Sequence, residues 1–330
     1  MSVGGLGFGS EQAAPGGLVA EPVHEVPEAP AARKIEGRSP LRLGIERLRH
    51  DRASMISLGV IVLVVLVAIF APVFGAITGH GADQQFYAPV GLTPDGQPLG
   101  PSGHFLLGTD PLGRDILVRI AYGARISLIV GVVATALTVA VGAIIGLAAG
   151  YFGGLTDSIL ARLMDVLLAF PFLLLGISLV TVIGPGFAVV IIVIGLFGWV
   201  AVGRIVRGQV LSIKEKEYVE AARSLGAGPW RIMFIDILPN VMAPIIVYTT
   251  LLIPLTIVTE ASLSFLGVGI PPPTPDWGQM ISDSQSVYQY GAWWFLVFPS
   301  LALLITTVAF NIFGDGVRDA FDPRGDQLFV

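Results

Sequence analysis

Six long apolar segments constrain this chain most strongly. A helix that crosses a hydrocarbon core of about 30 Å needs about 20 mostly apolar residues, and six segments meet or nearly meet that length. The segments are Ser54–Ile77, Ile126–Gly150, Ile159–Ile183, Phe187–Gly203, Val241–Phe265 and Trp294–Phe313. Only 13% of the residues are charged, compared with about 25% in soluble domains. The sequence therefore predicts an all-α polytopic membrane protein with about six transmembrane helices.

The Lys and Arg residues predict the orientation of these helices, because cytoplasmic loops are enriched in both. Of the 19 basic residues, seven lie within 33–52 and six more lie within 204–231. The opposite side has only Arg114, Arg119 and Arg125, and the loop 267–293 has none. Both termini and the segment 204–240 are therefore expected in the cytoplasm.

The spans divide the chain into six expected regions. Residues 1–40 are rich in Gly, Ala, Pro and Glu, which is typical of a disordered tail. A basic juxtamembrane segment (41–53), the first span (54–77) and an external loop with an interfacial helix (78–125) follow. A five-helix core (126–313) contains the cytoplasmic loop 204–240. Residues 314–330 form a cytoplasmic tail.

Several classes of chemistry are absent from the sequence. There is no cysteine, so the chain has no disulfide, thiolate nucleophile or cysteine-ligated metal. The four histidines lie far apart and form no HExxH motif, and no lysine belongs to a GxxxxGK[ST] phosphate loop. The net charge of −5 argues against nucleic acid as a partner. We expect neither a metal nor a cofactor on this chain.

The hydrophilic segment between the fourth and fifth spans predicts a helical hairpin. Lys214–Leu225 is expected to form a helix with Tyr218, Ala222 and Leu225 on one face, and Gly226-Ala227-Gly228 breaks it. A second helix begins at Pro229 and ends at Pro239. Its expected apolar stripe consists of Trp230, Met233, Phe234 and Ile237. The hairpin either fits a partner's groove and couples mechanically to it, or packs along the membrane surface through its apolar stripes.

One motif in this segment resembles the EAA loop of ATP-binding-cassette importer permeases, written EAAxxxG followed at a distance by IxLP. The matching residues are Glu220, Ala221, Ala222, Gly226, Leu238 and Pro239, and Asp236 departs from the pattern at the Ile position. Seven segments in order resemble the dipeptide and oligopeptide family, C-type subunit. They are Leu107–Asp115, Tyr122–Leu128, Met164–Leu175, Glu217–Ala227, Leu238–Ile245, Glu260–Gly278 and Phe313–Arg324.

The resemblance implies a type I importer permease in a bacterial cytoplasmic (inner) membrane. The six matching residues would then dock on an ATPase subunit. The expected partners are a second homologous permease, one or two ATPases and an external peptide-binding protein. ATP and Mg would be bound by the ATPases, and this chain would import peptides without being an enzyme. The family also includes relatives for nickel and other small solutes.

Two residues of the fifth span are candidates for the translocation pathway. Pro254 should kink the helix or free a carbonyl, and a fixed bend without motion is equally consistent. Glu260 is a carboxylate within the membrane, and such groups usually face protein or water. A hydrogen bond to a neighbouring loop is favoured for Glu260 over direct contact with substrate.

Three further patterns predict local structure. Gly142, Gly146 and Gly150 repeat at four-residue spacing, which allows close approach of another helix. Arg162 and Asp165 are expected to pair across one helix face. In the external loop, Thr109 or Asp110 should cap a helix that begins at Pro111 and carries the interfacial stripe Leu112, Ile116 and Ile120.

Two other classes of function remain as alternatives. A self-sufficient channel or ion-coupled carrier should have ionisable relays within its spans, and these spans have few. A membrane-embedded enzyme should show a paired catalytic constellation, and we find none in the sequence.

Overall fold

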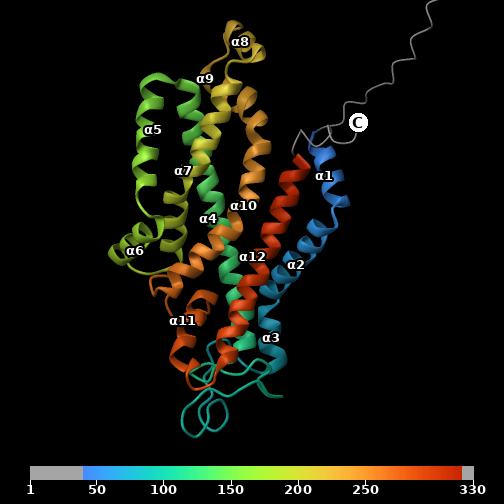
Figure 1. The fold of residues 1–330 in the computed structure, drawn as a ribbon, viewed down its shortest axis with the longest axis vertical. Helices are drawn as coiled ribbons and strands as arrows, with labels where there is room; N and C mark the ends of the chain where they lie inside the picture. Colours follow the sequence, from blue (N-terminus) through green and yellow to red (C-terminus); the bar gives the residue numbers. More distant parts are fainter. Residues whose placement is uncertain (1–39, 322–330) are drawn as a thin grey trace, which may run out of the picture. The chain divides into compact units, whose positions relative to one another are not determined.

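A computed structural model describes residues 40–321, which form helices and no β-strand (Figure 1). The expected all-α polytopic fold is thereby confirmed. Apart from Pro40, the tail expected over 1–40 lies outside the described residues, as does 322–330. Within residues 40–321, five helices are long and apolar enough to span a membrane, or six if one bent pair counts as a span.

The first apolar segment is divided between two helices. After α1 (Pro40–His50), α2 covers Arg52–Ile69 and α3 covers Ala71–Thr78. Asp51 caps α2 by accepting hydrogen bonds from the backbone nitrogens of Ala53 and Ser54, at 3.2 and 3.1 Å. Pro72 lies in the first turn of α3, where its missing N–H is tolerated. The expected single helix 54–77 is therefore interrupted at Phe70.

The second span is longer than the sequence predicts. The helix α4 covers Ile116–Phe152, 37 residues without interruption. It includes most of the segment expected to be a separate interfacial helix. Its N-cap is Asp115, which accepts a hydrogen bond from the nitrogen of Leu117 at 2.8 Å. The prediction that Thr109 or Asp110 caps a helix was wrong, because both bond within the preceding loop.

The third apolar segment bends sharply. The helices α5 (Gly154–Ala169) and α6 (Phe172–Ile183) meet at 88°. Pro171 disfavours helical geometry at the residue before it, and Phe170 is extended there, with ψ 131°. The segment expected as one helix over 159–183 is thus a bent pair.

The expected hairpin is present, but its second arm does not end at Pro239. Helix α7 covers Phe187–Ile213, and α8 covers Glu217–Ser224. The short α9 (Pro229–Arg231) leads into a π-helix, Ile232–Ile237, and then into α10, Leu238–Phe265. Because Pro239 lies in the first turn of α10, where proline is tolerated, the second arm continues directly into the fifth span.

The last part of the chain contains a helix that the sequence analysis missed. The loop 267–293 includes α11, Trp277–Tyr288, capped by Asp276, whose carboxylate accepts from the nitrogen of Gly278 at 2.9 Å. Helix α12 covers Trp293–Phe321. It continues past Phe313, so the region expected as a tail from residue 314 begins inside a helix.

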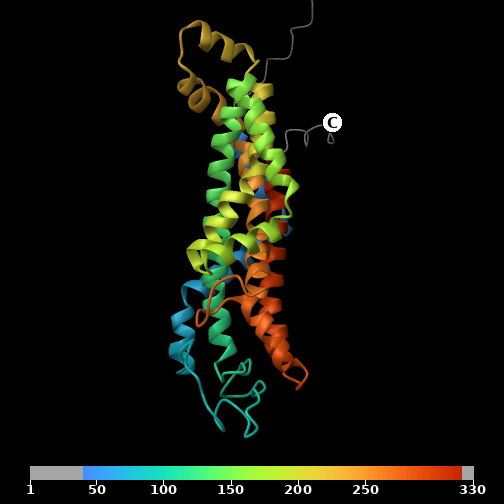
Figure 2. The same cartoon turned by 90° about the vertical axis from the view of Figure 1, so that its left-hand side faces the viewer.

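The glycine repeat of α4 packs against α7. A Cβ at Gly142, Gly146 or Gly150 would lie within 2.6–2.7 Å of α7 atoms, among them the Val202 Cβ and the Gly203 carbonyl oxygen. The prediction that these glycines allow close helix packing is confirmed. Figures 1 and 2 show α8 at one end of this bundle and the loop 79–115 at the other.

Candidate functional site

The hairpin formed by residues 217–237 depends on the backbone of Gly226. This residue has φ +82°, which side-chain-bearing residues rarely adopt. Its nitrogen donates to the Arg223 carbonyl, and the nitrogen of Ala227 donates to the Ala222 carbonyl, both at 3.0 Å. These bonds end α8 with a left-handed C-terminal turn. The glycine of the EAA-like motif therefore reverses the chain at the tip of the hairpin.

Val219 anchors α8 to the rest of the molecule. Its side chain is completely buried in a cluster that includes Val206 and Val210 of α7 and Ile232 and Ile237 of the π-helix. Ala222 and Ala227 pack against the same cluster. The inward side of the hairpin therefore belongs to the same apolar cluster as residues of α7 and the π-helix.

The apolar stripe expected on α8 was placed on the wrong face. Tyr218 and Leu225 are exposed by 45% and 89%, and only Ala222 of the three expected residues packs inward. Val219, which the predicted stripe did not include, occupies the buried position. The inward face is thus set by Val219 and Ala222, three residues apart.

The second arm is also divided differently from the prediction. Met233 and Ile237 are buried, whereas Trp230 and Phe234 are exposed and stack on each other, with ring centroids 6.0 Å apart. The π-helix hydrogen bonds from i to i+5 make a wider turn than an α-helix. Residues three apart, such as Trp230 and Met233, consequently no longer share one face.

The outward face of the hairpin carries charged side chains that have no ion-pair partner among the described residues. Glu217, Glu220 and Arg223 are exposed, and within residues 40–321 none of them forms an ion pair. Ala221 is also exposed, so a second surface can approach α8 closely there. The remaining motif residues, Leu238 and Pro239, lie at the start of α10 beyond the π-helix. The face 217–223 is therefore suited to a partner that brings complementary charges.

Three basic residues of the α7 region fix the base of the hairpin. Lys214 Nζ donates to the Gly150 carbonyl at 3.0 Å, and Arg207 pairs with Asp157 of α5. Arg204 pairs with Asp165. The expected partner of Asp165, Arg162, is 4.0 Å away and 86% exposed. The predicted Arg162–Asp165 pair is therefore secondary to a contact between helices.

Glu260 lies in a closed polar cluster. It is fully buried, and its two carboxyl oxygens accept hydrogen bonds from Ser127 Oγ at 3.3 Å and Ser264 Oγ at 3.2 Å. Pro254 is also buried, within a helix that continues through it. Asp276 is buried in the same region, and burial raises the pKa of its carboxyl. A role of Pro254 or Glu260 in a pathway stays a prediction.

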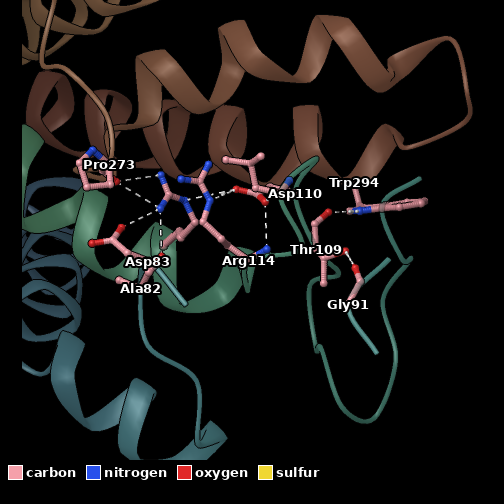
Figure 3. A network of polar contacts seen from close by, with 10 residues as sticks. Ala82, Asp83, Gly91, Thr109, Asp110, Arg114, Pro273 and Trp294 are labelled. Carbon is pink, nitrogen blue, oxygen red and sulfur yellow. Dashed lines mark hydrogen bonds and ion pairs between the residues drawn. The ribbon is translucent and has the colours of Figure 1, made fainter. Parts of the chain in front are cut away.

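The loop 79–115, called the distal loop below, is held by buried polar side chains (Figure 3). Asp110 is fully buried; it accepts from Arg114 Nε at 2.6 Å and lies 3.6 Å from Arg119 Nε. Thr109 Oγ1 donates to the Gly91 carbonyl at 2.7 Å, and Trp294 Nε1 donates to the Thr109 carbonyl at 3.2 Å. The segment Leu107–Asp115 therefore builds the fold of this loop, a role that the sequence analysis did not identify.

Arg119 joins the distal loop to a distant part of the chain. It donates from Nη1 to the carbonyl of Ala82 at 3.0 Å, to Asp83 at 3.2 Å and to the carbonyl of Pro273 at 3.4 Å.

No group of three or more His, Cys, Asp or Glu side chains among the described residues could hold a metal ion.

Two family models match the sequence that forms these helices and the projecting hairpin. Residues 142–326 match the family of binding-protein-dependent transport system inner membrane components, and residues 39–91 match the N-terminal transmembrane domain of oligopeptide transport permease C. The chain therefore belongs to this family of transport permeases.

Individual relatives narrow the family further. The oligopeptide transport system permease protein OppC of Bacillus subtilis is 44% identical over 278 residues, which is 84% of this chain and 88% of the relative. The dipeptide transport system permease protein DppC of the same organism is 42% identical over 278 residues, 84% of each chain. OppC of Escherichia coli is 42% identical over 291 residues, 88% of this chain and 93% of the relative. The predicted membership of the C-type dipeptide and oligopeptide branch is confirmed.

Proposed function

We propose that this chain is the permease subunit of an ATP-driven importer of di- or oligopeptides, forms half of the translocation pathway, and docks on an ATPase through the hairpin 217–237. The observation that supports it best is the hairpin itself. Its inward face is anchored by Val219, whereas its outward face presents Glu217, Glu220 and Arg223 without partners among the described residues.

The continuity of the chain would allow this docking to drive transport. The second arm passes through the π-helix directly into α10, which contains Pro254 and Glu260. A shift of the docked hairpin would therefore move α10 relative to α4. The two helices are joined by the hydrogen bond from Ser127 of α4 to Glu260 of α10. The sequence has no phosphate loop, so ATP and Mg would be bound by separate ATPase subunits.

The other partners follow from the family. The names of the relatives specify oligopeptides and dipeptides, which supports peptide as the substrate here. We expect a second, homologous permease to complete the pathway and an external binding protein to deliver the peptide. In this arrangement the hairpin faces the cytoplasm of a bacterial cell, and the distal loop faces the outside.

Deletion of 220–226 tests the proposal. Without these residues the ATPases lose their docking face, so peptide uptake by cells should be abolished while the permease remains in the membrane. Co-purification of the ATPases in mild detergent should be lost in parallel. The matched control is Gly228→Ala, because Gly228 has φ −72° and open space around it. Normal uptake by the deletion variant would contradict the docking role.

Reconstitution separates this function from the alternatives. The complete assembly should import peptide into liposomes only with ATP, and the purified chain alone should transport nothing. Transport by the chain alone under an ion gradient would instead favour a self-sufficient channel or carrier.

A further inference from the structure

A pocket with both apolar and charged lining residues lies between the distal loop and α11, outside the hairpin and the Glu260 cluster. It has a volume of about 380 Å³ and is lined by Pro111, Leu112, Arg114, Ser282, Asp283 and Ser286. A volume of this size is within the range of pockets that bind small ligands. The distal loop contributes Pro111, Leu112 and Arg114 to the lining. Helix α11 contributes the hydroxyls of Ser282 and Ser286 and the carboxylate of Asp283.

The charged groups around this pocket are paired unevenly. Three carboxylates, those of Asp83, Asp110 and Asp283, accompany two guanidinium groups, those of Arg114 and Arg119. Asp110 pairs with Arg114, and Asp83 pairs with Arg119. Asp283 is left, and it forms no ion pair within residues 40–321. Asp283 is thus the one lining carboxylate, and it has no ion-pair partner among the described residues.

Arg114 has unused hydrogen-bond donors beside this carboxylate. Its Nε and its backbone nitrogen both donate to Asp110. Its two terminal nitrogens donate to no group of the described chain, and they are not among the atoms that are sealed from solvent without a partner. A guanidinium that is only 7% exposed can use these donors only toward a group that enters the pocket.

A ligand that brings both a cation for Asp283 and an acceptor for Arg114 would match the side chains of this pocket. A metal ion supplies no acceptor, and the side-chain ammonium of a lysine has no carbonyl close to it. The first residue of a peptide has both groups, an ammonium and, next to it, a carbonyl oxygen. Ser282, whose hydroxyl has no partner among the described residues, can accept a further hydrogen bond from the ammonium.

We propose that this pocket binds the amino-terminal residue of a peptide, with the ammonium on Asp283 and the first carbonyl on Arg114. This rests on the proposed function, since it assigns a peptide subsite to the outward face of a peptide permease. Charge-assisted hydrogen bonds of this kind are stronger than neutral ones. The pocket would hold the free amino terminus of the substrate before or during its entry.

The test measures direct binding of radiolabelled dialanine to the purified assembly of both permeases and the ATPases in nanodiscs, without the binding protein. We expect Asp283→Asn to weaken binding about tenfold or more, and Asp283→Glu to restore most of it. N-acetyl-dialanine should bind the wild type as weakly as dialanine binds the Asp283→Asn variant. Asp95→Asn, an exposed aspartate of the distal loop, is the matched control and should change nothing.

Three results of the binding assay would each overturn the proposal. They are the absence of saturable binding to the wild type, equal binding by wild type and Asp283→Asn, and equal binding of acetylated and free peptide. A loss of binding-protein association in Asp283→Asn with unchanged peptide binding would also overturn it, in favour of a lysine of that protein. Peptide import by the complete wild-type assembly is measured in parallel, because its absence would refute the proposed function itself.

Discussion

The hairpin and the distal loop lie at opposite ends of the bundle and use charged residues in opposite ways. In the hairpin, Glu217, Glu220 and Arg223 are exposed and unpaired within the described chain. In the distal loop, Asp110, Arg114 and Asp115 are buried and bonded to their own chain. Both ends carry motifs of the same family. One motif of a family can therefore form an exposed face that is free to bind a partner, whereas another motif of the same family forms the internal framework of a loop.

The largest effect is expected where the buried network is broken. Asp110→Ala removes the carboxylate that accepts from Arg114 Nε and from the backbone nitrogens of Leu112 and Arg114. Leaving buried guanidinium groups without their counter-ion costs about 3–5 kcal/mol. The thermal denaturation temperature in detergent should fall strongly. Asp95→Ala, in the exposed part of the same loop, serves as control, and equal stability of the two variants would contradict the framework role.

A smaller effect is expected at the anchor of the hairpin. Val219→Ala removes two buried methyl groups, which at about 0.8 kcal/mol each costs about 1.6 kcal/mol. Because α8 is held mainly by this side chain, the loss should appear as faster proteolysis near residues 217–228 with an intact membrane core. Tyr218→Ala is the neighbouring exposed control. Unchanged proteolysis in Val219→Ala would show that α8 is held in another way.

The turn of the hairpin offers a matched pair of glycines. Gly226→Ala places a side chain at φ +82° and should destabilise the turn by about 1 kcal/mol. Gly228→Ala has the same open surroundings and an ordinary φ of −72°. Amide hydrogen exchange in α8 should therefore accelerate in the first variant only. Equal exchange rates in both would remove the reason for glycine in this motif.

The smallest effect on stability is expected on the exposed face. Glu220→Ala should change the free energy of unfolding by no more than about 0.5 kcal/mol, because the side chain has no partner in the described chain. Association with the ATPases should nevertheless weaken. If Glu220→Ala instead lowered the stability as Asp110→Ala does, the contrast between the two ends would fail.

The half-buried carboxylate of Asp283 should make the stability of the protein depend on pH. Burial raises the pKa of its carboxyl above the usual value, so the folded state binds this proton more tightly than the unfolded chain does. Ionising Asp283 therefore lowers stability as the pH rises through the raised pKa, and the penalty disappears below the unfolded value. Asp283→Asn should stabilise the protein at pH 7 and lose that advantage as the pH falls toward 4. The reverse trend would contradict the pKa shift.

The sequence predicted the spans better than the contacts between them. Apolar runs depend on local composition, so helices occupy all six predicted segments, although the first is interrupted at Phe70 and the third is a bent pair. The spacing of Gly142, Gly146 and Gly150 correctly predicted close packing. The bend at Pro171 had a visible signal that a hydropathy window passes over. Helix α11 was missed because its 12 residues are too short and too polar to resemble a span.

The candidate site could be predicted only in outline. The turn at Gly226 follows from local chemistry, but the π-helix that separates Trp230 from Met233 has no periodic signal. The role of Arg119 depends on the carbonyl of Pro273, 154 residues further along the chain. Likewise, the pocket unites Arg114 with Asp283 of a helix that was not expected. Contacts of this range are set by the tertiary fold and are not encoded in any one segment.

The glycine contact between α4 and α7 has a mechanical consequence. Helix α4, with 37 residues, is about 55 Å long. Its first turn is capped by Asp115 of the distal loop, and its last turn is tied to the base of the hairpin through the bond from Lys214 to Gly150. Two helices whose backbones touch at three successive levels resist bending between those points. The pair is therefore stiff over the last part of α4, next to the base of the hairpin, so a tilt of α7 at that base would carry this end of α4 with it.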